Sequence, residues 1–468
     1  MDDEASSLRT VRPQSLGMYT VYNLLTAAGM VLLFPYFLVR GLMRGEPFGH
    51  ARQRLGWEFP PELRNGRPGT PRTAAIWLHA VSVGEVQAAL PLASELRARF
   101  PLHRLVVSTT TATGQKLARE RLLAANAFLY FPLDWEGPLR RAFGAVQPAA
   151  VIIVETEIWP NFLRQARRAG VPVIFVNGRL SEKSFRGFRR AVSLSGGLLQ
   201  GFLTRILNDA TLFLMQSEKD AERLLRLGAD PGRVIVTGNL KYDLGTAAPS
   251  PLPSWLASVM ARHKRSPVVV AGSILPGEVA PVLRAFAEVE RRFPRALLIL
   301  APRKPDQFDA MARMVAGSGR RVIRRSQTDL NDDCHTPLAE PGSLFLLDSV
   351  GELAGVYRHA DAVFVGGSLV PSGGHNLLEP AAYSKPPVFG PFMENFQEIS
   401  DKFLAAGAGI QVRSAQGLGA AWLELLSDQD RSAQKGAAAR TLVEQNRGAT
   451  ARVLEHIERI VARAGSVV

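Results

Sequence analysis

Residues 75–108 read AIWLHAVSVGEVQAALPLASELRARFPLHRLVVS, and this stretch decides the fold. Two short apolar runs, 75–79 and 104–108, flank an amphipathic helical segment at 86–100. Continuous apolar runs bounded by turns are typical of parallel strands that are covered on both faces. The stretch therefore predicts a strand–helix–strand unit, the building block of an open, doubly wound sheet.

The same alternation continues along the chain. A Pro-rich segment at 247–253 (AAPSPLP) interrupts it once and is typical of an interdomain linker. Beyond 75–108, we expect a helix at 113–123, a last long helical stretch at 437–464, and strands at 149–154, 171–177, 267–271, 296–301, 343–347 and 362–365. The fold class is therefore α/β, with two Rossmann-like domains facing a cleft, and we place them at 46–246 and 247–468 after an N-terminal tail and membrane anchor at 1–45.

Composition narrows the class of protein. The chain has 468 residues, of which 46% are apolar, and this suits two ordered domains. Cys334 is the single cysteine, so no internal disulfide can form, and no Cys/His cluster has the spacing of a structural zinc site. The net charge of +14 has two explanations, genomic base composition or attraction to an anionic membrane or phosphorylated lipid. Nucleic acid is not an expected partner, because the arginines are spread along the chain without a nucleic-acid-binding motif.

The N-terminal segment 18–39 reads MYTVYNLLTAAGMVLLFPYFLV, 22 residues without a charge. As a helix it is about 33 Å long, enough to cross a bilayer. No cleavage site follows it, so we interpret it as an uncleaved membrane anchor, although Asn23 and Pro35 also allow a helix that lies in the membrane interface. Arg40 and Arg44 follow closely, which predicts that the domains lie on the cytoplasmic side.

Carboxylates follow two predicted strands of the first domain. Glu85 comes after 75–79 and opens a helix, so it either complements the helix dipole or acts as a general base. Glu155 and Glu157 directly follow 149–154, where they either cap the next helix or serve the site. Lys241 closes the first domain, just before the linker. Ligands of such sheets bind at the carboxyl ends of the strands, so these side chains are candidates for the site.

The second domain carries candidate phosphate-binding segments at its strand ends. Ala271-Gly-Ser273 is a small-residue turn after a strand, and Arg303 follows the next strand, where a guanidinium can clamp a phosphate. The glycine-rich segment 365–380 (VGGSLVPSGGHNLLEP) leads into a helix, so its free backbone N–H groups can receive an anion. Asn376 and Glu379 within it also have the spacing of a capping box. No P-loop motif and no dinucleotide-binding G-x-G-x-x-G occurs in the required context.

Nine motifs between Trp77 and Tyr383 occur in an order that resembles one family. They are WLHAVSVGE, STTTATG, FPLDW, VETEIWPN, NGRLS, TGNLKYD, APRKP, VGEL and FVGGSLVPSGGHNLLEPAAY. Together they resemble the bacterial 3-deoxy-D-manno-octulosonic acid (Kdo) transferases of lipopolysaccharide core biosynthesis. The resemblance implies the glycosyltransferase-B architecture, CMP-Kdo as the donor co-substrate, a lipid A precursor as the acceptor and inversion at the anomeric carbon. It also implies a location at the cell inner membrane, and we expect neither a metal nor another cofactor.

The resemblance also implies roles for individual residues. Glu85 is expected to be the catalytic base, and Glu155 and Lys241 are expected to stabilise the transition state. The residues expected to bind CMP are Pro302, Arg303, Val350, Gly351, Glu352, Asn376, Leu377, Leu378 and Glu379.

Two alternatives stay open from the sequence. One is an enzyme of the same architecture that transfers or epimerises a UDP-sugar, and release of CMP rather than UDP separates the two. The other is a non-catalytic basic protein of the membrane surface, which would show salt-sensitive binding to anionic vesicles but no saturable CMP site. Carboxylates at strand ends, such as Glu85 and Glu155, fit this second alternative poorly.

Overall fold

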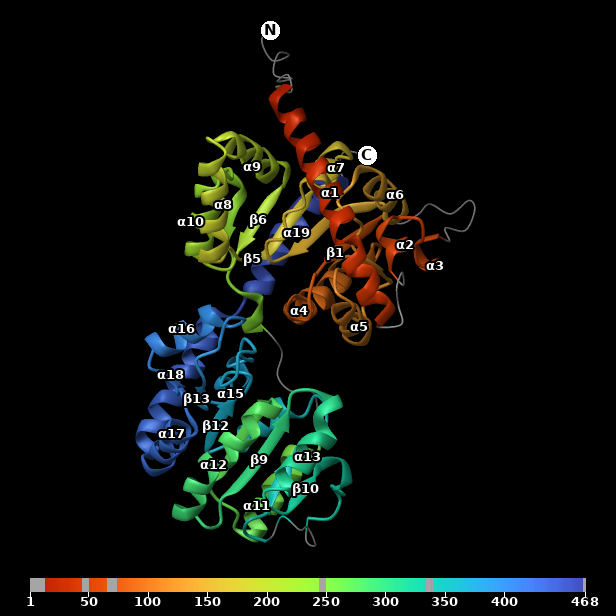
Figure 1. Ribbon diagram of the computed structural model, residues 1–468. Helices are drawn as coiled ribbons and strands as arrows, with labels where there is room; N and C mark the ends of the chain where they lie inside the picture. The colour runs from red at the N-terminus through yellow and green to blue at the C-terminus, as the bar shows by residue number, and fades with distance from the viewer. Residues whose placement is uncertain are drawn as a thin grey trace. The chain divides into compact units, whose positions relative to one another are not determined.

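The computed structural model describes residues 13–43, 50–64, 74–243, 250–333, 338 and 340–465, and within the first helix it describes side chains from 17 to 32. The chain divides into two compact units (Figure 1). Unit 1 comprises Met1–Leu244 and Arg447–Val468, and unit 2 comprises Gly245–Asn446. Cys334 and residues 247–249 of the expected interdomain linker lie outside the described residues.

Unit 1 is built on a seven-stranded parallel sheet with the order β3-β2-β1-β4-β5-β6-β7. The strands are β1 (Ala75–His79), β2 (Arg104–Thr109), β3 (Ala127–Tyr130), β4 (Pro148–Val154), β5 (Val173–Gly178), β6 (Leu212–Met215) and β7 (Val234–Val236). Its helices are α1 (Pro13–Met43), α2 (Ala51–Arg54), α3 (Pro61–Arg64), α4 (Val83–Arg99), α5 (Ala112–Arg121), α6 (Glu136–Val146), α7 (Pro160–Arg168), α8 (Glu182–Leu194), α9 (Leu198–Asp209), α10 (Glu218–Arg226) and α19 (Ala449–Gly465), with 3₁₀ turns η1 (Pro231–Arg233) and η2 (Leu240–Asp243).

Unit 2 repeats the design with the order β10-β11-β9-β8-β12-β13-β14, again all parallel. The strands are β8 (Val268–Ile274), β9 (Leu297–Pro302), β10 (Val322–Arg324), β11 (Leu344–Leu346), β12 (Ala362–Val365), β13 (Pro387–Phe389) and β14 (Ile410–Gln411). The helices and 3₁₀ turns are α11 (Leu252–His263), α12 (Pro276–Arg292), η3 (Pro305–Gln307), α13 (Phe308–Ala316), η4 (Arg325–Gln327), α14 (Leu353–Val356), η6 (Tyr357–His359), α15 (Leu378–Ala381), α16 (Gln397–Ala405), α17 (Ala415–Ser427) and α18 (Gln429–Asn446). The prediction of two Rossmann-like α/β halves is confirmed.

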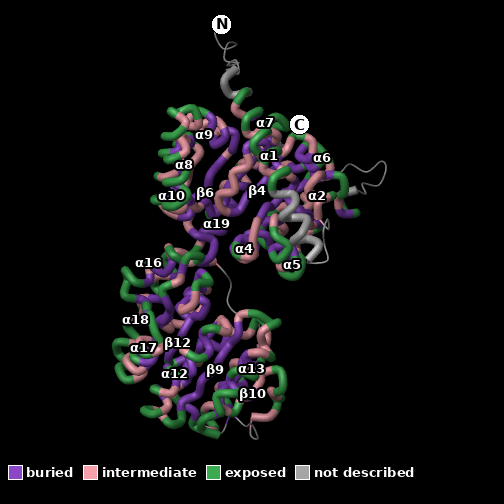
Figure 2. The backbone as a smooth tube through the Cα atoms, viewed as in Figure 1, coloured by how far each residue is buried: buried purple, intermediate pink, exposed green. Residues whose placement is uncertain are grey.

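The central strands are buried on both faces, as the continuous apolar runs predict. Every residue of β1, β9 and β12 is buried, and helices cover both sides of each sheet (Figures 1 and 2). The strand order reverses beside β1 in unit 1 and beside β8 in unit 2. Loops separate at such a switch point and leave a crevice at the carboxyl ends of the strands, so this is where a ligand site is expected in each unit.

The C-terminal helical stretch differs from the prediction in two ways. The helix expected at 437–464 is broken, because α18 ends at Asn446 and Gly448 adopts a φ of +85°, a conformation that favours glycine. The second helix, α19, belongs to unit 1 and not to the C-terminal domain, since Val453, Leu454 and Ile457 pack into the unit 1 core. Asp243 fixes this return by accepting hydrogen bonds from the backbone N–H groups of Gly448 (2.7 Å) and Thr450 (2.6 Å).

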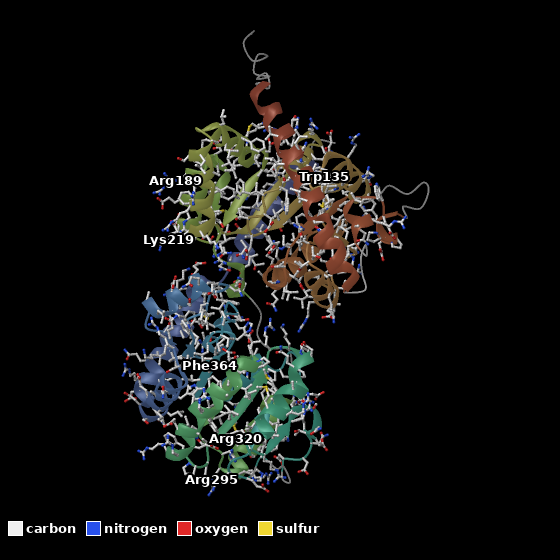
Figure 3. The ribbon with its side chains drawn as sticks, viewed as in Figure 1. Trp135, Arg189, Lys219, Arg295, Arg320 and Phe364 are labelled. Atoms are coloured by element: carbon white, nitrogen blue, oxygen red, sulfur yellow. The ribbon has the colours of Figure 1, made fainter. Side chains whose placement is uncertain are left out.

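The described part of α1 packs along unit 1 through polar and aromatic side chains. Tyr19 is buried and donates to Asp209 (3.2 Å), and Tyr22 donates to Asp134 (2.8 Å). The Trp135 indole, labelled in Figure 3, donates to Thr26 (3.2 Å). Among the described residues, no helix is long and apolar enough to cross a membrane. The predicted anchor, 18–39, extends beyond the described side chains, and a spanning anchor is not confirmed.

Candidate active site

Glu85 lies in the first turn of α4, directly after β1, at the switch point of unit 1. Its side chain is only 7% exposed. One carboxylate oxygen accepts a hydrogen bond from the Val81 backbone N–H (2.7 Å), and the other accepts one from the Ser82 hydroxyl (2.9 Å). These contacts cap the helix, as the first interpretation predicts. An ionised carboxylate has about four acceptor positions, so the same two oxygens can still accept a proton from a substrate.

The surroundings of Glu85 favour a base that works near neutral pH. Burial raises its pKa to about 7, and the negative charges of Glu155 and Glu157 add to that shift. The hydrogen bonds from Val81 and Ser82 act in the opposite direction but do not cancel the shift. A group with a pKa near the working pH combines a useful fraction of the unprotonated form with good basicity.

Glu155 and Glu157 share this edge of the sheet with Glu85. Glu155 directly follows β4, the neighbour of β1, and its φ of +61° lies in the left-handed region that non-glycine residues seldom adopt. Its backbone N–H donates to the Val176 carbonyl (2.9 Å), which holds this conformation. The pKa of Glu157 is raised, first by burial and then by the charge of Glu155. Three carboxylates therefore meet where the sequence predicted a site.

A closed chain of amides positions Lys241, which lies in η2 and is 9% exposed. The Asn239 side-chain oxygen accepts the Lys241 backbone N–H (3.0 Å), and the Asn239 amide donates to Gln216 (2.9 Å). Gln216 donates to the Asn177 carbonyl (2.9 Å), and the Asn177 side-chain oxygen accepts the backbone N–H of Leu240 (2.9 Å). The ends of β5 and β6 are thus tied to the turn that carries Lys241.

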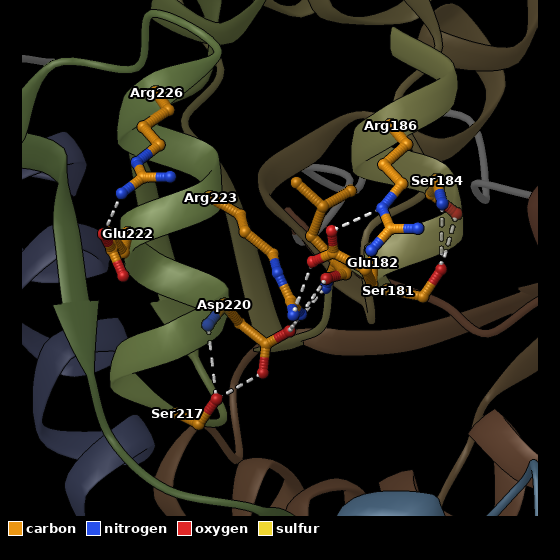
Figure 4. Close-up of polar contacts among 10 residues, drawn as sticks. Ser181, Glu182, Ser184, Arg186, Ser217, Asp220, Glu222, Arg223 and Arg226 are labelled. Carbon is orange, nitrogen blue, oxygen red and sulfur yellow. Dashed lines mark hydrogen bonds and ion pairs between the residues drawn. The ribbon is translucent and has the colours of Figure 1, made fainter. Parts of the chain in front are cut away.

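The loop after β5 is fixed by ionic contacts with α10 (Figure 4). Asp220 accepts the Leu180 backbone N–H (2.8 Å), while Arg223 donates to the Leu180 carbonyl (2.9 Å) and pairs with Glu182 (3.0 Å). Ser181 accepts the backbone N–H of Ser184 (3.1 Å) at the start of α8. Within this segment, NGRLS in sequence, these contacts hold Leu180 and Ser181 in place.

In unit 2, Arg303 directly follows β9 and lies near His375 and Glu379. Burial lowers the pKa of His375 to about 3, and the charges of Arg303 and Lys304 lower it further, so the imidazole is neutral. Its Nε2 is buried and has no hydrogen-bond partner among the described residues. The pKa of Glu379 is raised by burial, and this is partly offset by a hydrogen bond from Asn376 (3.3 Å) and by Arg303. Of the residues expected to bind CMP, the structure thus brings together Arg303, Asn376 and Glu379.

The remaining predicted CMP-binding residues lie beside these three or in the segment after β11. Pro302 ends β9, Leu377 and Leu378 are buried at the start of α15, and Val350 is 62% exposed after β11. Gly351 has a φ of +90°. The Glu352 carboxylate is fully engaged, because it accepts hydrogen bonds from Arg325 (3.0 Å), Ser250 (2.6 Å) and Ser349. These bonds outweigh the effect of burial and lower its pKa.

The expectation that the glycine-rich segment offers free N–H groups to an anion is wrong for its first part. The backbone N–H groups of Gly367 (2.7 Å), Ser368 (3.0 Å) and Leu369 (2.9 Å) all donate to the carboxylate of Glu278. Glu278 is fully buried in the first turn of α12, and it also accepts the Leu275 N–H (3.0 Å). A protein carboxylate therefore occupies the position that the pattern suggested for a ligand anion.

The expected turn at Ala271-Gly-Ser273 lies within β8, which continues to Ile274. The strand is irregular there, because its pairing with β9 shifts register between Ala271 and Ile274 and Ser273 has a φ of +56°. The Gly272 site has no room for a side chain, since a Cβ there would lie 1.9 Å from the Tyr357 hydroxyl. This close approach, and not a phosphate, explains the glycine.

Sequence analysis missed the residues that hold the site residues in place. Glu278, Arg325 and Gln216 were not singled out, and Ser82, Asn177 and Asn239 appeared only within quoted motifs, without a role of their own. For Glu278 a signal existed, because Pro276-Gly-Glu278 opens a helix and predicts a carboxylate in its first turn. Among the described residues, no group of three or more potential metal ligands is found.

Two doubly wound units with functional groups at their switch points define the glycosyltransferase-B architecture. The solved UDP complex of MnaA from S. aureus shares this fold, with a TM-score of 0.53 and 14% identity over 83% of this chain and 97% of that chain. The UDP-GlcNAc 2-epimerase of Neisseria meningitidis bound to UDP-GlcNAc also shares it, with a TM-score of 0.52 and 12% identity over 82% of this chain and 100% of that chain. At such identities the likeness concerns the fold alone.

Sequence relatives identify the family. Residues 49–244 match the family described as 3-deoxy-D-manno-octulosonic-acid transferase (kdotransferase). A 3-deoxy-D-manno-octulosonic acid transferase of Haemophilus influenzae is 32% identical over 85% of this chain and 90% of its own length. One from Bordetella pertussis is 33% identical over 86% of this chain and 92% of its own length. The chain belongs to the Kdo transferase family and is therefore a glycosyltransferase.

The pKa of Glu85 predicts the pH dependence of the enzyme. If Glu85 is the catalytic base, as the family resemblance implies, kcat/KM should rise about tenfold per pH unit up to about pH 7 and then level off, because only the ionised carboxylate accepts a proton. Measurement of kcat/KM between pH 5 and 9, which lie on either side of that value, checks this. A profile without a rise anywhere between pH 5 and 9, or one that falls through this range, would contradict that role.

The raised pKa of Glu85 also makes the free energy of unfolding depend on pH. The pKa of Glu85 is higher in the folded chain than its reference value of 4.5. The folded state therefore binds more protons than the unfolded state between these two values. Ionisation of Glu85 lowers the free energy of unfolding as the pH rises from about 4.5 to about 7.

Proposed function

We propose that the enzyme moves Kdo from CMP-Kdo to a hydroxyl of a lipid A precursor in lipopolysaccharide core biosynthesis. The observation that carries the proposal is the buried Glu85, a carboxylate with a pKa of about 7 at the switch point of unit 1. In a single displacement the acceptor oxygen attacks the anomeric carbon while its proton passes to Glu85. The bond from that carbon to the phosphate oxygen breaks, and CMP leaves with the electron pair, so the configuration inverts.

We propose that cationic side chains, rather than a cofactor, stabilise the negative charge of the leaving group. In unit 2, we assign to Arg303 the positive charge that faces the phosphate of the bound nucleotide. In unit 1, we assign to Lys241 and Glu155 the stabilisation of charge that develops in the transition state. CMP is a good leaving group, so the proposed step uses side chains alone and CMP-Kdo is a co-substrate. Val350 and Gly351 contribute backbone groups to the nucleotide, because the Glu352 carboxylate is already engaged by Arg325 and Ser250.

The donor assignment predicts a defined effect of Arg303. Arg303→Ala should weaken binding of CMP by about 1.5–3 kcal/mol, the range for a hydrogen bond to a charged group. Arg303→Lys should recover only part of this, since lysine lacks the planar fork. Isothermal calorimetry with CMP measures both, with UDP as the competing nucleotide and exposed Arg313→Ala as the control. Unchanged CMP affinity in Arg303→Ala, or tighter binding of UDP than of CMP by the unaltered enzyme, would contradict the donor assignment.

We also propose that α1 holds the enzyme at the cytoplasmic face of the inner membrane. Tyr19, Tyr22 and Thr26 face unit 1, and the opposite face of the helix is apolar and exposed. The exposed apolar residues of this face are Val21 (47%), Leu24 (65%), Leu25 (68%), Val31 (72%) and Leu32 (78%). Apolar residues at helical spacing on the outside of a helix, followed in sequence by Arg40 and Arg44, suit a helix that lies in an anionic interface.

This assignment predicts the behaviour of a surface variant. Changing Leu24, Leu25, Val31 and Leu32 to Gln should weaken binding to vesicles of phosphatidylglycerol and phosphatidylethanolamine at least tenfold, because each buried leucine contributes about 1.5–3 kcal/mol. Deletion of α1 is a poorer test, since it removes Tyr19 from the unit 1 core. Leu102→Gln with Leu123→Gln, which are 82% and 84% exposed, is the matched control. Co-sedimentation equal to that of the unaltered protein would contradict the assignment.

A further inference from the structure

Arg54 is a cation without a counter-charge at the edge of the unit 1 sheet. It ends α2, donates through Nη2 to the Thr110 carbonyl, and lies over the Tyr130 ring at 5.5 Å. Within the described residues, no carboxylate forms an ion pair with this guanidinium, whereas exposed Arg52 on the same short helix lies 4.0 Å from Glu58. Burial lowers the pKa of Arg54, because the guanidinium has lost part of its hydration. A bound anion would stabilise this charge.

Hydrogen bonds link this guanidinium to Glu85. Thr110, whose carbonyl accepts from Arg54, donates its backbone N–H to the Val81 carbonyl (3.2 Å). Val81 in turn donates its own N–H to the Glu85 carboxylate (2.7 Å). Arg54 and Glu85 are therefore held on the same edge, at the carboxyl ends of β2 and β1, with only Thr110 and Val81 between them.

A polar group beside Arg54 has no hydrogen-bond partner among the described residues. The Thr110 hydroxyl is buried and makes no hydrogen bond to any described residue. The nearby His79 ring is neutral. Burial lowers its pKa to about 3, and the positive charge of Arg54 also lowers it. His79 therefore adds no second positive charge beside Arg54.

We propose that Arg54 and Thr110 form an oxyanion subsite that binds a phosphate or carboxylate of the acceptor, next to the hydroxyl that Glu85 deprotonates. The planar guanidinium fork matches the geometry of both groups, and a hydroxyl can add a third hydrogen bond. The subsite fixes the acceptor hydroxyl at the base and selects acidic acceptors over neutral ones. The proposal rests on the proposed function, because it assigns part of the acceptor site of that reaction.

Three acceptors test the subsite with CMP-Kdo as the donor. They are a phosphorylated glucosamine disaccharide, the same disaccharide after phosphatase treatment, and a phosphatase-treated disaccharide that already carries one Kdo and hence a carboxylate. The unaltered enzyme should use an anionic acceptor with a kcat/KM about 10- to 100-fold above that of the neutral one, the ratio expected for one charged hydrogen bond. Arg54→Gln should bring this ratio close to one, and Arg54→Lys should leave an intermediate ratio.

Controls separate recognition from folding. Arg52→Gln should keep the full ratio. Thr110→Val, which replaces the hydroxyl by a methyl group of similar size, should lower the ratio even if Arg54→Gln does not fold. A loss confined to the phosphorylated acceptor identifies a phosphate, and a loss confined to the Kdo-bearing acceptor identifies a carboxylate. Equal losses on all three acceptors, or an unchanged ratio, would overturn the subsite. If the unaltered enzyme transfers Kdo to none of them, the proposed function fails instead.

Discussion

Glu85→Gln should lower kcat by about 10²–10⁴, the usual contribution of general base catalysis. Glutamine keeps the size of the side chain and can still accept a hydrogen bond from Val81 or Ser82, but it cannot take a proton from the acceptor hydroxyl. Binding of CMP, measured by calorimetry, should remain nearly unchanged because the proposed nucleotide-binding residues belong to unit 2. The effect should therefore appear in turnover and not in donor affinity.

A matched control separates catalysis from helix capping. Glu218 also occupies the first turn of its helix, α10, but it is exposed and follows a different strand. Glu218→Gln should leave kcat within about twofold and cost at most about 1 kcal/mol of stability, the range for a charge near a helix terminus. If folded Glu85→Gln behaves like this control, Glu85 only caps α4, and Glu155 and Glu157 become the candidates for the base.

Lys241→Met should lower kcat/KM by about 10²–10³, the loss that follows removal of one preorganised group from a transition state. Methionine keeps much of the length and volume of the side chain but removes the charge. The Asn239 contact to the Lys241 backbone does not depend on the side chain, so η2 should keep its conformation. Steady-state kinetics and a thermal melt together show whether activity is lost without loss of fold.

Lys219, labelled in Figure 3, provides the control for this variant. It is exposed on α10, and Lys219→Met should leave kcat/KM unchanged. A Lys241→Met enzyme with a normal melting temperature and a kcat/KM within about threefold of the unaltered enzyme would remove Lys241 from the reaction.

The sequence predicted the central strands well because burial on both faces leaves a clear pattern. All eight strands expected from apolar runs exist, including those beside both switch points. Six others were not named, among them β7, β10 and β14, which have three, three and two residues. Runs this short show no period, and edge strands lack the continuous apolar character of central ones. The sequence also could not show that α19 packs into the core of unit 1, because a helical pattern does not reveal which core the apolar face of a helix contacts.

The candidate site was predicted in outline because strand ends converge in a doubly wound sheet. Glu85, Glu155 and Arg303 lie where their positions after strands required. The sequence could not show that Glu278 occupies the N–H groups of the glycine-rich segment, since the two lie 89 residues apart. It also could not distinguish engaged carboxylates from available ones. Glu352 accepts hydrogen bonds from Arg325 and two serines, whereas Glu85 is buried beside other carboxylates, and only three-dimensional packing separates these environments.

Mass spectrometry of the reaction products is the most direct test of the central claim, that this enzyme transfers Kdo from CMP-Kdo. The purified full-length protein is incubated in detergent with CMP-Kdo and a lipid A precursor, and the lipid product and free CMP are quantified together. We predict that the acceptor gains the mass of one or more Kdo residues and that one CMP is released for each. Unchanged acceptor mass with active, folded protein, or sugar transfer only when a UDP-sugar replaces CMP-Kdo, would contradict the account.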